Sequence, residues 1–262
     1  MNLAIIGYGK MGKMIEKAAL EKGHKITAII DPLLTDPATL LGTEIYNSVE
    51  KAGNLNNADA AIEFTTPGTA VENIKALAKI KMPMVIGTTG WHDQLDEVTK
   101  AVDAAGTSLI WSSNFSMGVN VFYRVAWYAT KLLDSFPEFD IGGFETHHNS
   151  KLDSPSGTAK TLVNGVLARS KRKKKAVWEK LDRKPEPDEL HFSSLRVGSV
   201  PGTHSLFFDS PADTIEITHT ARNRESLVAG AIRAAVWLAD SSGGKRQGVF
   251  TIDDMLKDIL DI

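Results

Sequence analysis

Residues 3–12 of the chain read Leu-Ala-Ile-Ile-Gly-Tyr-Gly-Lys-Met-Gly. The apolar run Leu3–Ile6 is typical of a buried strand, and Gly7–Gly12 fits the pattern G-x-G-x-x-G. Helical spacing of apolar residues follows over Lys13–Glu21, and a β-branched run follows at Lys25–Ile30. A glycine-rich turn between a strand and a helix is the arrangement that binds dinucleotides in Rossmann-type folds. The stretch therefore predicts an α/β fold with a doubly wound parallel sheet.

Each glycine of the motif has its own physical reason. Gly7 permits a tight turn, Gly9 lets the backbone approach a pyrophosphate, and Gly12 lets the helix pack closely on the strand. Amides at the start of the helix then face the phosphates. A tight turn without a binding role would also explain the motif, but its place between strand and helix favours a dinucleotide. The residues of the motif are Gly7, Tyr8, Gly9, Lys10, Met11 and Gly12.

The second predicted strand ends at Asp31, where a carboxylate can accept hydrogen bonds from an adenosine ribose. A carboxylate here opposes a 2′-phosphate, and the next residue is Pro32, not an arginine that would attract one. We therefore expect NADH to be at least as acceptable as NADPH, with Lys10 as the nearby cation that offsets this preference. A turn residue before proline is the alternative explanation of Asp31.

Strand and helix patterns alternate up to a small polar loop at residues 112–118, where we place a domain boundary. We expect a dinucleotide-binding domain at residues 1–113 and an α+β domain with a mostly antiparallel sheet at 114–238. The tail 239–262 is expected to pack back on the first domain. The predicted strands are 58–64, 84–86, 108–111, 140–145, 190–196, 204–208 and 213–220, and the further helices are 69–79, 95–105, 121–133, one from 155, and 226–239.

Composition excludes several classes of protein. The 262 residues carry a formal charge of −2, which gives no reason to expect nucleic acid or an anionic membrane as partner. There is no cysteine, so disulfides and thiolate metal sites are excluded. We find neither a secretory leader nor about 18 consecutive uncharged apolar residues, and we expect a cytoplasmic protein. The basic run Lys171–Lys175 is expected to be a solvated helix end without a functional role.

Residues 145–158 hold the densest group of ionisable and small polar side chains. Ser154 is suited to cap a helix that begins with Pro155, so that the amides of Gly157 and Thr158 face outward and can hold a substrate carboxylate. The segment thus supplies an acid, a base and an anion-binding helix end. We expect the chemistry to take place here.

The histidine pair in this segment constrains the site. On a regular strand His147 and His148 point to opposite faces, so both serve one site only where the strand ends, and otherwise one of them is structural. Lys151 brings a positive charge or, if desolvated, a proton donor. We expect no metal, because adjacent histidines beside a lysine lack the spacing of zinc motifs. Ser156 lacks the G-x-S-x-G of a serine hydrolase.

The segment Glu145–Ala159 fits E-x-H-H-x-x-K-x-D-x-P-S-G-T-A without a break. Together with Gly87–Gly90, Asn114–Asn120, Leu195–Gly198 and Ile217–His219, it resembles the 4-hydroxy-tetrahydrodipicolinate reductase (dihydrodipicolinate reductase) family of lysine and diaminopimelate biosynthesis. The resemblance spans almost the whole chain. It implies reduction of a cyclic dicarboxylate by NAD(P)H with loss of water, and a homotetramer formed through the sheet of the second domain.

The resemblance also implies roles for single residues. His147 and Lys151 match the proposed proton donors, and His148, Gly157 and Thr158 match substrate-binding positions. Besides the glycine loop and Asp31, the implied cofactor contacts are Gly87, Thr88, Thr89, Ser112, Ser113, Asn114 and Phe115.

Three features depart from the family pattern. The glycine loop is one residue shorter than in the enteric form of the family. Glu63 replaces a frequent aspartate, and Ser150 stands where a further histidine sometimes occurs. Because of the first departure, the family's phosphate contacts do not transfer one to one onto residues of this loop. The other two departures lie outside the essential signature.

Two other functions fit parts of the pattern. A related imine or amino-acid dehydrogenase could share the two-domain plan, although a substrate with one carboxylate has no need of the Pro155–Thr158 cradle. A protein that senses NAD(H) without catalysis is a different class, and it has no need of both His147 and Lys151. Fold alone does not decide between these alternatives.

Overall fold

The computed structural model describes residues 1–34, 43–52, 55, 57–178, 180–240 and 246–260. Contacts divide the chain into two compact units, Met1–Ser116 with Leu227–Ile262, and Met117–Ser226. Relative to the domain boundaries expected from the sequence, this grouping also assigns residues 114–116 and 227–238 to the first unit. Residues 241–245 and 261–262 of the expected tail lie outside the described part.

The first unit is built on a seven-stranded sheet in which every described pair of neighbours is parallel. Its order, β12-β6-β5-β4-β1-β2-β3, reverses direction at β1 and so creates the switch point where ligands bind in such sheets. The predicted parallel sheet is confirmed. Its strands are β1 (Asn2–Ile6), β2 (Lys25–Ile30), β3 (Glu44–Tyr46), β4 (Ala60–Glu63), β5 (Met84–Ile86), β6 (Ser108–Trp111) and β12 (Gly248–Thr251).

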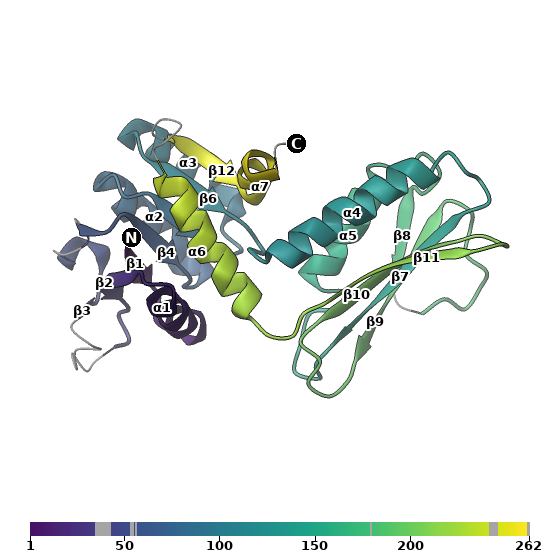
Figure 1. Ribbon diagram of the computed structural model, residues 1–262, viewed down its shortest axis with the longest axis horizontal. Helices are drawn as coiled ribbons and strands as arrows, with labels where there is room; N and C mark the ends of the chain where they lie inside the picture. The colour runs from purple at the N-terminus through teal and green to yellow at the C-terminus, as the bar shows by residue number, and fades with distance from the viewer. Residues whose placement is uncertain (35–42, 53–54, 56, 179, 241–245, 261–262) are drawn as a thin grey trace. The chain divides into compact units, whose positions relative to one another are not determined.

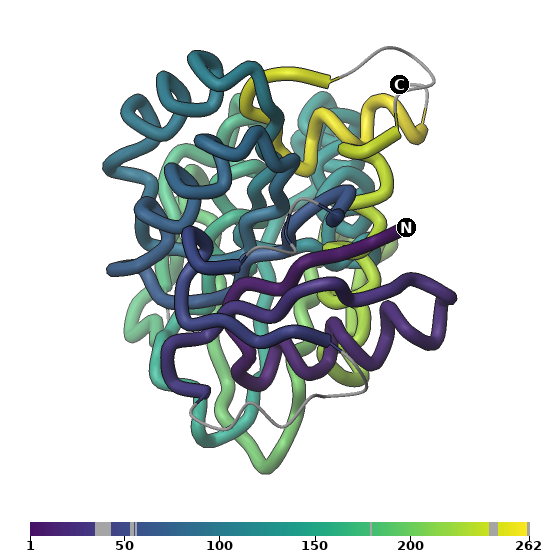
Figure 2. The backbone as a smooth tube through the Cα atoms, turned by 90° about the vertical axis from the view of Figure 1, so that its left-hand side faces the viewer, coloured from purple at the N-terminus to yellow at the C-terminus, as the bar shows by residue number. Residues whose placement is uncertain are grey.

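Helices cover both faces of this sheet (Figures 1 and 2). Helices α1 (Lys10–Glu21) and α6 (Glu225–Ala239) lie on one face, and α2 (Pro67–Lys79) and α3 (Leu95–Ala105) lie on the other. The last helix, α7 (Ile252–Leu260), is joined to α6 by a hydrogen bond from Trp237 to Asp258. The C-terminal segment thus packs on the first unit, where β12 adds a strand beside β6.

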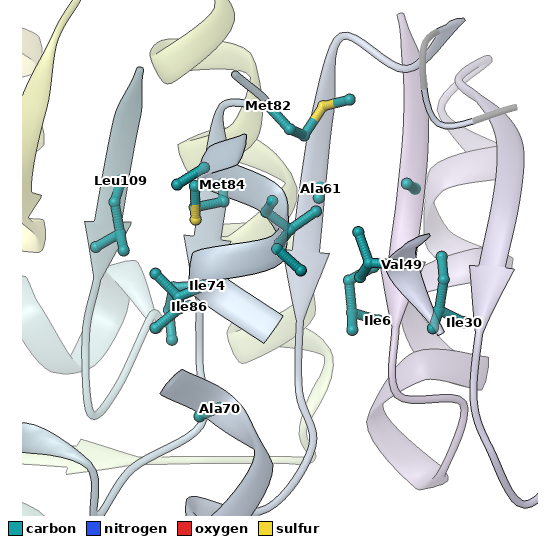
Figure 3. Close-up of a cluster of buried hydrophobic side chains, with 14 of the residues drawn as sticks. Ile6, Ile30, Val49, Ala61, Ala70, Ile74, Met82, Met84, Ile86 and Leu109 are labelled. Carbon is teal, nitrogen blue, oxygen red and sulfur yellow. The ribbon is translucent and has the colours of Figure 1, made fainter. Parts of the chain in front are cut away.

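One buried cluster holds strands and helices together in this unit. Figure 3 shows apolar side chains from β1, β2, β4, β5 and β6 gathered on the face that α2 covers. Ile6, Ile30, Met84 and Ile86 come from the strands, and Ile74 comes from α2. Burial of this kind contributes about 25 cal/mol per Å² of apolar surface, and it fixes the strand ends that carry the loops described below.

The second unit is a five-stranded mixed sheet of order β11-β10-β7-β9-β8 with two helices. The pairs β11–β10 and β10–β7 are antiparallel, and the pairs β7–β9 and β9–β8 are parallel. Helices α4 and α5 share one apolar core with the strands. The elements are α4 (Met117–Leu133), β7 (Asp140–His147), α5 (Gly157–Leu167), β8 (Lys175–Trp178), β9 (Glu189–Arg196), β10 (Thr203–Asp209) and β11 (Thr214–Thr220).

The basic run is not the solvated helix end that was expected. Helix α5 stops at Leu167, and Lys175 already belongs to strand β8. Lys173 is 2 % exposed, its ammonium group donates to the carbonyls of Pro187 and Glu189, and it pairs with Asp140. This lysine is buried because two carbonyls and a carboxylate replace its water shell.

Among the described residues, no helix is both long enough and apolar enough to span a lipid bilayer.

Candidate active site

The glycine loop has the geometry that the sequence predicts. Gly7 adopts φ +90°, and a Cβ there would stand 2.2 Å from the carbonyl oxygen of Phe64. A Cβ on Gly12 would stand 2.2 Å from the carbonyl oxygen of Gly7. A Cβ on Gly9 would meet no protein atom within 4 Å. Gly7 and Gly12 are therefore required by packing, whereas the space beside Gly9 is open to a ligand.

A cavity of about 530 Å³ adjoins this loop, at the carboxyl ends of β1, β2 and β4. Its volume is in the range of small-molecule and cofactor sites. Three predicted contacts, Gly7, Gly9 and Asp31, line it, and the other predicted cofactor residues do not. Thr65, Thr66 and Asn73 also line it and had not been predicted; the place of Thr65 and Thr66 just beyond the carboxyl end of β4 would have indicated those two, whereas Asn73 lies in α2.

Asp31 has a structural role in this cavity. Its carboxylate accepts hydrogen bonds from the amide of Tyr8 at 2.7 Å and from the amide of Leu33 at 2.9 Å. It thereby ties the glycine loop to the turn after β2, which is the turn role that the sequence left open. Each oxygen keeps a second lone pair that can accept from a ribose hydroxyl.

The two other predicted cofactor loops follow β5 and β6. A Cβ on Gly87 would stand 2.1 Å from the ring of Phe64, and the Thr88 hydroxyl accepts from the amide of Thr65 at 2.7 Å. Ser112 and Phe115 are buried. Of these loops, Thr89 and Ser113 are exposed, whereas Gly87 and Asn114 are half-buried. The buried residues Thr88, Ser112 and Phe115 thus stabilise the conformation of these loops.

In the second unit, Glu145 is the centre of a buried polar cluster. Its side chain is fully buried at the end of β7. One carboxylate oxygen accepts from the Ser156 amide at 2.9 Å and from the Arg196 guanidinium at 3.3 Å. The other accepts from the Ser156 hydroxyl and lies 3.2 Å from Nε2 of His204 and 3.5 Å from Nδ1 of His147.

These contacts keep Glu145 ionised. Burial opposes its charge, but the hydrogen bonds from His204 and from the hydroxyl and amide of Ser156 outweigh burial and hold the pKa of the carboxyl far below its usual value. At the predicted catalytic histidine, His147, the effect of burial is the larger one. Burial lowers the pKa of His147 to about 4, with Glu145 opposing this and His204, Lys151 and Arg196 adding to it. His147 is therefore uncharged at neutral pH.

Strand β7 ends at His147, so His148 lies just beyond the strand, as both residues serving one site would require. His148 is half-buried, and its Nδ1 lies 2.8 Å from the Ser150 hydroxyl. The ammonium group of Lys151 pairs with Asp153 at 2.7 Å. Lys151 also lowers the pKa of His147 through its charge, so the two predicted proton donors share one electrostatic environment.

The predicted helix cap was wrong by two residues. Helix α5 begins at Gly157, and Ser156 is its cap, because the Ser156 hydroxyl accepts from the amide of Ala159 at 3.0 Å. Ser154 and Pro155 precede the helix. Gly157 is exposed, and a Cβ there would meet nothing within 4 Å. The open, positively polarised end of α5 thus remains available to an anion, as the sequence implied.

Glu145 and Arg196 lie in the motifs quoted above, but no individual role was predicted for either of them or for His204. In the sheet, His204 lies opposite Glu145 on β10, and Arg196 lies opposite His147 on β9. Glu145 and His147 share one face of β7 because they are two residues apart. That spacing was visible in the sequence, whereas the cross-strand partners depend on register.

The described residues include one group with metal-ligand spacing, Glu145, His147 and His204, whose ligand atoms lie within 4.8 Å of one another. A cation there would have to displace the hydrogen bond that the Ser156 hydroxyl donates to the carboxylate oxygen facing both histidines, and it would lie close to the Arg196 charge on the other oxygen. The arrangement therefore fits a hydrogen-bonded cluster better than a metal site.

Comparison with known proteins agrees with this geometry. The N-terminal model of the family described as dihydrodipicolinate reductase matches residues 1–115, and the C-terminal model matches residues 118–256. A 4-hydroxy-tetrahydrodipicolinate reductase from Christiangramia forsetii is 36% identical over 261 residues, 99% of either chain. Another from Archaeoglobus fulgidus is 35% identical and covers 98% of this chain and 100% of its own.

Among solved structures, the dipicolinate-bound dihydrodipicolinate reductase from Paenisporosarcina sp. TG-14 has a TM-score of 0.78 at 21% identity, over 99% of each chain. An amine dehydrogenase from Mycobacterium smegmatis has a TM-score of 0.61 at 12% identity, over 97% of this chain and 95% of its own, and shows a shared fold only. The family models and the full-length relatives confirm the resemblance seen in the motifs, and the chain belongs to the dihydrodipicolinate reductase family.

Proposed function

We propose that the chain reduces 4-hydroxy-tetrahydrodipicolinate to tetrahydrodipicolinate with NAD(P)H and loss of water, in lysine and diaminopimelate biosynthesis. The observation that carries this function is the unbroken signature from Glu145 to Ala159, folded so that a buried carboxylate, an uncharged histidine and an open helix end belong to one cluster. Full-length relatives with this activity support it.

The residues of the first unit fit a dinucleotide. The open space beside Gly9 would accept the pyrophosphate near the start of α1, and Asp31, which lines the same cavity, would accept from the adenosine ribose. When bound, the reduced nicotinamide supplies the hydride. The chain itself has to bind and orient the cofactor and exclude water. We propose that NADH is at least as acceptable as NADPH, since Asp31 would repel a 2′-phosphate.

The residues of the second unit fit an anionic substrate and a proton transfer. The free amides at the start of α5, at Gly157 and Thr158, would hold one carboxylate, and His148 and Lys151 would contact the substrate from the loop after β7. A hydride added to a ring carbon leaves negative charge that a nearby acid must neutralise. Lys151 is the better donor of that proton, because the low pKa of His147 leaves it uncharged at neutral pH.

We propose a cytoplasmic homotetramer that associates through the sheet of the second unit. The support is a row of apolar side chains on its outer face, where Phe144 is stacked on Phe207 with ring centroids 5.8 Å apart and Leu195 is 55% exposed. Exposed apolar patches of this kind are typical of association surfaces. Mass measurement by light scattering of the wild type and of Leu195→Glu would test the assembly.

The reaction can be tested with substrate generated by dihydrodipicolinate synthase from pyruvate and aspartate semialdehyde. Substrate-dependent loss of NADH absorbance is expected, with a kcat/KM for NADH at least as high as that for NADPH. If the Asp31 carboxylate disfavours NADPH, Asp31→Ser should raise the kcat/KM for NADPH relative to that for NADH. Tight NADH binding without substrate-dependent oxidation would contradict the proposed reaction and leave a binding protein.

A further inference from the structure

Glu63 is a buried carboxyl group that the proposed chemistry does not use. It is the last residue of β4, in the middle of the parallel sheet, and it has no exposed surface. Its neighbours in register are Ile6 on β1 and Ile86 on β5. A carboxylate in such surroundings needs a cation or several donors to remain charged.

No cation pairs with Glu63 in the part of the chain that the structure describes. Lys75, on the adjoining helix α2, pairs with Glu72 and Glu97 instead. The carboxyl oxygen Oε2 of Glu63 is buried and has no hydrogen-bond partner. Burial raises the pKa of Glu63, although the neighbouring side chains of Thr65, Thr88 and Asn73 oppose that rise. These surroundings favour the protonated acid.

The neutral neighbours of Glu63 lead directly to the cofactor cavity. Its Oε1 is hydrogen-bonded to the Thr65 hydroxyl, which lies 2.9 Å from the Thr69 hydroxyl and 3.4 Å from the amide nitrogen of Asn73. Thr65, Thr69 and Asn73 all line the cavity. The Thr65 amide also donates to Thr88 in the loop after β5. Two loops and the first turns of α2 therefore converge above one buried carboxyl group.

We propose that Glu63 acts as an uncharged carboxylic acid and is a positioning residue for the cofactor cavity. A protonated carboxyl can both donate to and accept from hydroxyl groups, so it can anchor the threonine network without an unpaired buried charge. This inference rests on the proposed function, because it assumes that the cavity binds the dinucleotide. It does not place Glu63 in contact with the cofactor.

Two substitutions test whether Glu63 acts as an uncharged acid or as a carboxylate. Glu63→Gln keeps the shape and offers a donor and an acceptor without charge, and should leave the Kd for NADH within about twofold of wild type. Glu63→Leu removes both, and should weaken NADH binding about five- to tenfold through the loss of one buried hydrogen bond. Glu21→Gln, at an exposed helix position, is the matched control. NADH fluorescence titration on the full chain measures all four proteins.

Infrared spectroscopy reads the protonation state without any ligand. At neutral pH the wild type should show the C=O stretch of a protonated carboxylic acid, and this band should be missing from Glu63→Gln and present in Glu21→Gln. Its absence from the wild type would overturn the proposal, even if Glu63→Leu fails to fold. Equally weak NADH binding by folded Glu63→Gln and Glu63→Leu would also overturn it, as would wild-type affinity in folded Glu63→Leu.

The outcomes also separate this inference from the proposed function. If the wild type binds neither NADH nor NADPH, the proposed function fails and the role of Glu63 in cofactor binding fails with it. If the wild type binds and oxidises NADH with substrate but shows no acid band, the function stands and the Glu63 inference alone is wrong.

Discussion

Glu145 and Ser156 are joined by two hydrogen bonds, from the Ser156 amide to one carboxylate oxygen and from the Ser156 hydroxyl to the other. Ser156 is also the cap of α5. The end of strand β7, with its histidine, and the open end of the helix are therefore held by one buried carboxylate. A change at Glu145 should disturb both the fold and the substrate site.

Glu145→Gln should destabilise the protein by about 3–5 kcal/mol, the usual cost of removing one partner from a buried charged pair. The amide has one acceptor for two Ser156 donors, and it no longer balances the Arg196 charge. Urea unfolding followed by circular dichroism measures the loss. Glu21→Gln, which removes an exposed helix pair, should cost at most about 0.5 kcal/mol. Equal stability of the two variants would contradict the central role of Glu145.

The dependence of stability on pH in the acid range gives a second test of Glu145. Its pKa in the folded chain lies below the ordinary value of 4.5, so its contribution is complete above pH 4.5 and is lost as the pH falls below it. The difference in unfolding free energy between wild type and Glu145→Gln should therefore become smaller as the pH is lowered. A gap that widens toward low pH would contradict this.

His147 should behave as an uncharged ring over the whole physiological range. Since burial lowers its pKa from 6.5 to about 4, the unfolded chain takes up the proton before the folded chain does. The stabilisation is complete above pH 6.5 and is lost as the pH falls toward 4, by roughly 3 kcal/mol in all. His147→Gln should flatten the decline of stability between these pH values. Histidine-selective NMR should show no titration of His147 above pH 5, and a midpoint near 6.5 would sink the prediction.

Lys151→Ala should lower kcat by about 100-fold or more, the range expected for loss of a general acid. The Kd for NADH should stay within about twofold of wild type, since the lysine lies in the loop after β7 and not at the glycine loop. Lys160→Ala, an exposed lysine of α5, is the control. Steady-state rates together with NADH titration make the distinction, and a near-normal kcat would remove Lys151 from the proton transfer.

Five strands of the first unit, β1, β2, β4, β5 and β6, could be predicted because local signals suffice there, whereas the short strands β3 and β12 were missed. The apolar run at β1 and the glycines of residues 7–12 each reflect contacts within a few residues of chain. Strand β8 was missed because it lies within and just after the basic run, where the buried ammonium group of Lys173 is held by the carbonyls of residues 187 and 189 and by the carboxylate of Asp140. Such distant partners leave no periodic pattern in the sequence.

For the same reason, only part of the site could be predicted. The signature around His147 and Lys151 is contiguous, whereas Arg196 and His204 reach it across strand pairs whose register no local pattern specifies. The helix cap was misplaced because Ser154 and Ser156 are equally good caps by residue type. The tertiary contact of Ser156 with Glu145 accompanies the cap that the structure adopts.

Gly9→Ala tests the cofactor loop with little risk to the fold. Gly9 has φ −75° and ψ −155°, which alanine can adopt, and its Cβ would meet no protein atom within 4 Å. Stability should change by less than about 1 kcal/mol, while the new methyl group should block the pyrophosphate and weaken NADH binding about tenfold or more. Gly68→Ala, in the first turn of α2 with equally open surroundings, is the matched control for both measurements. Gly12→Ala should instead unfold more easily, because its Cβ would stand 2.2 Å from the Gly7 carbonyl oxygen. Normal NADH affinity in Gly9→Ala would mean that the pyrophosphate does not pass over Gly9, and the phosphate site would then have to lie elsewhere along the carboxyl ends of the strands.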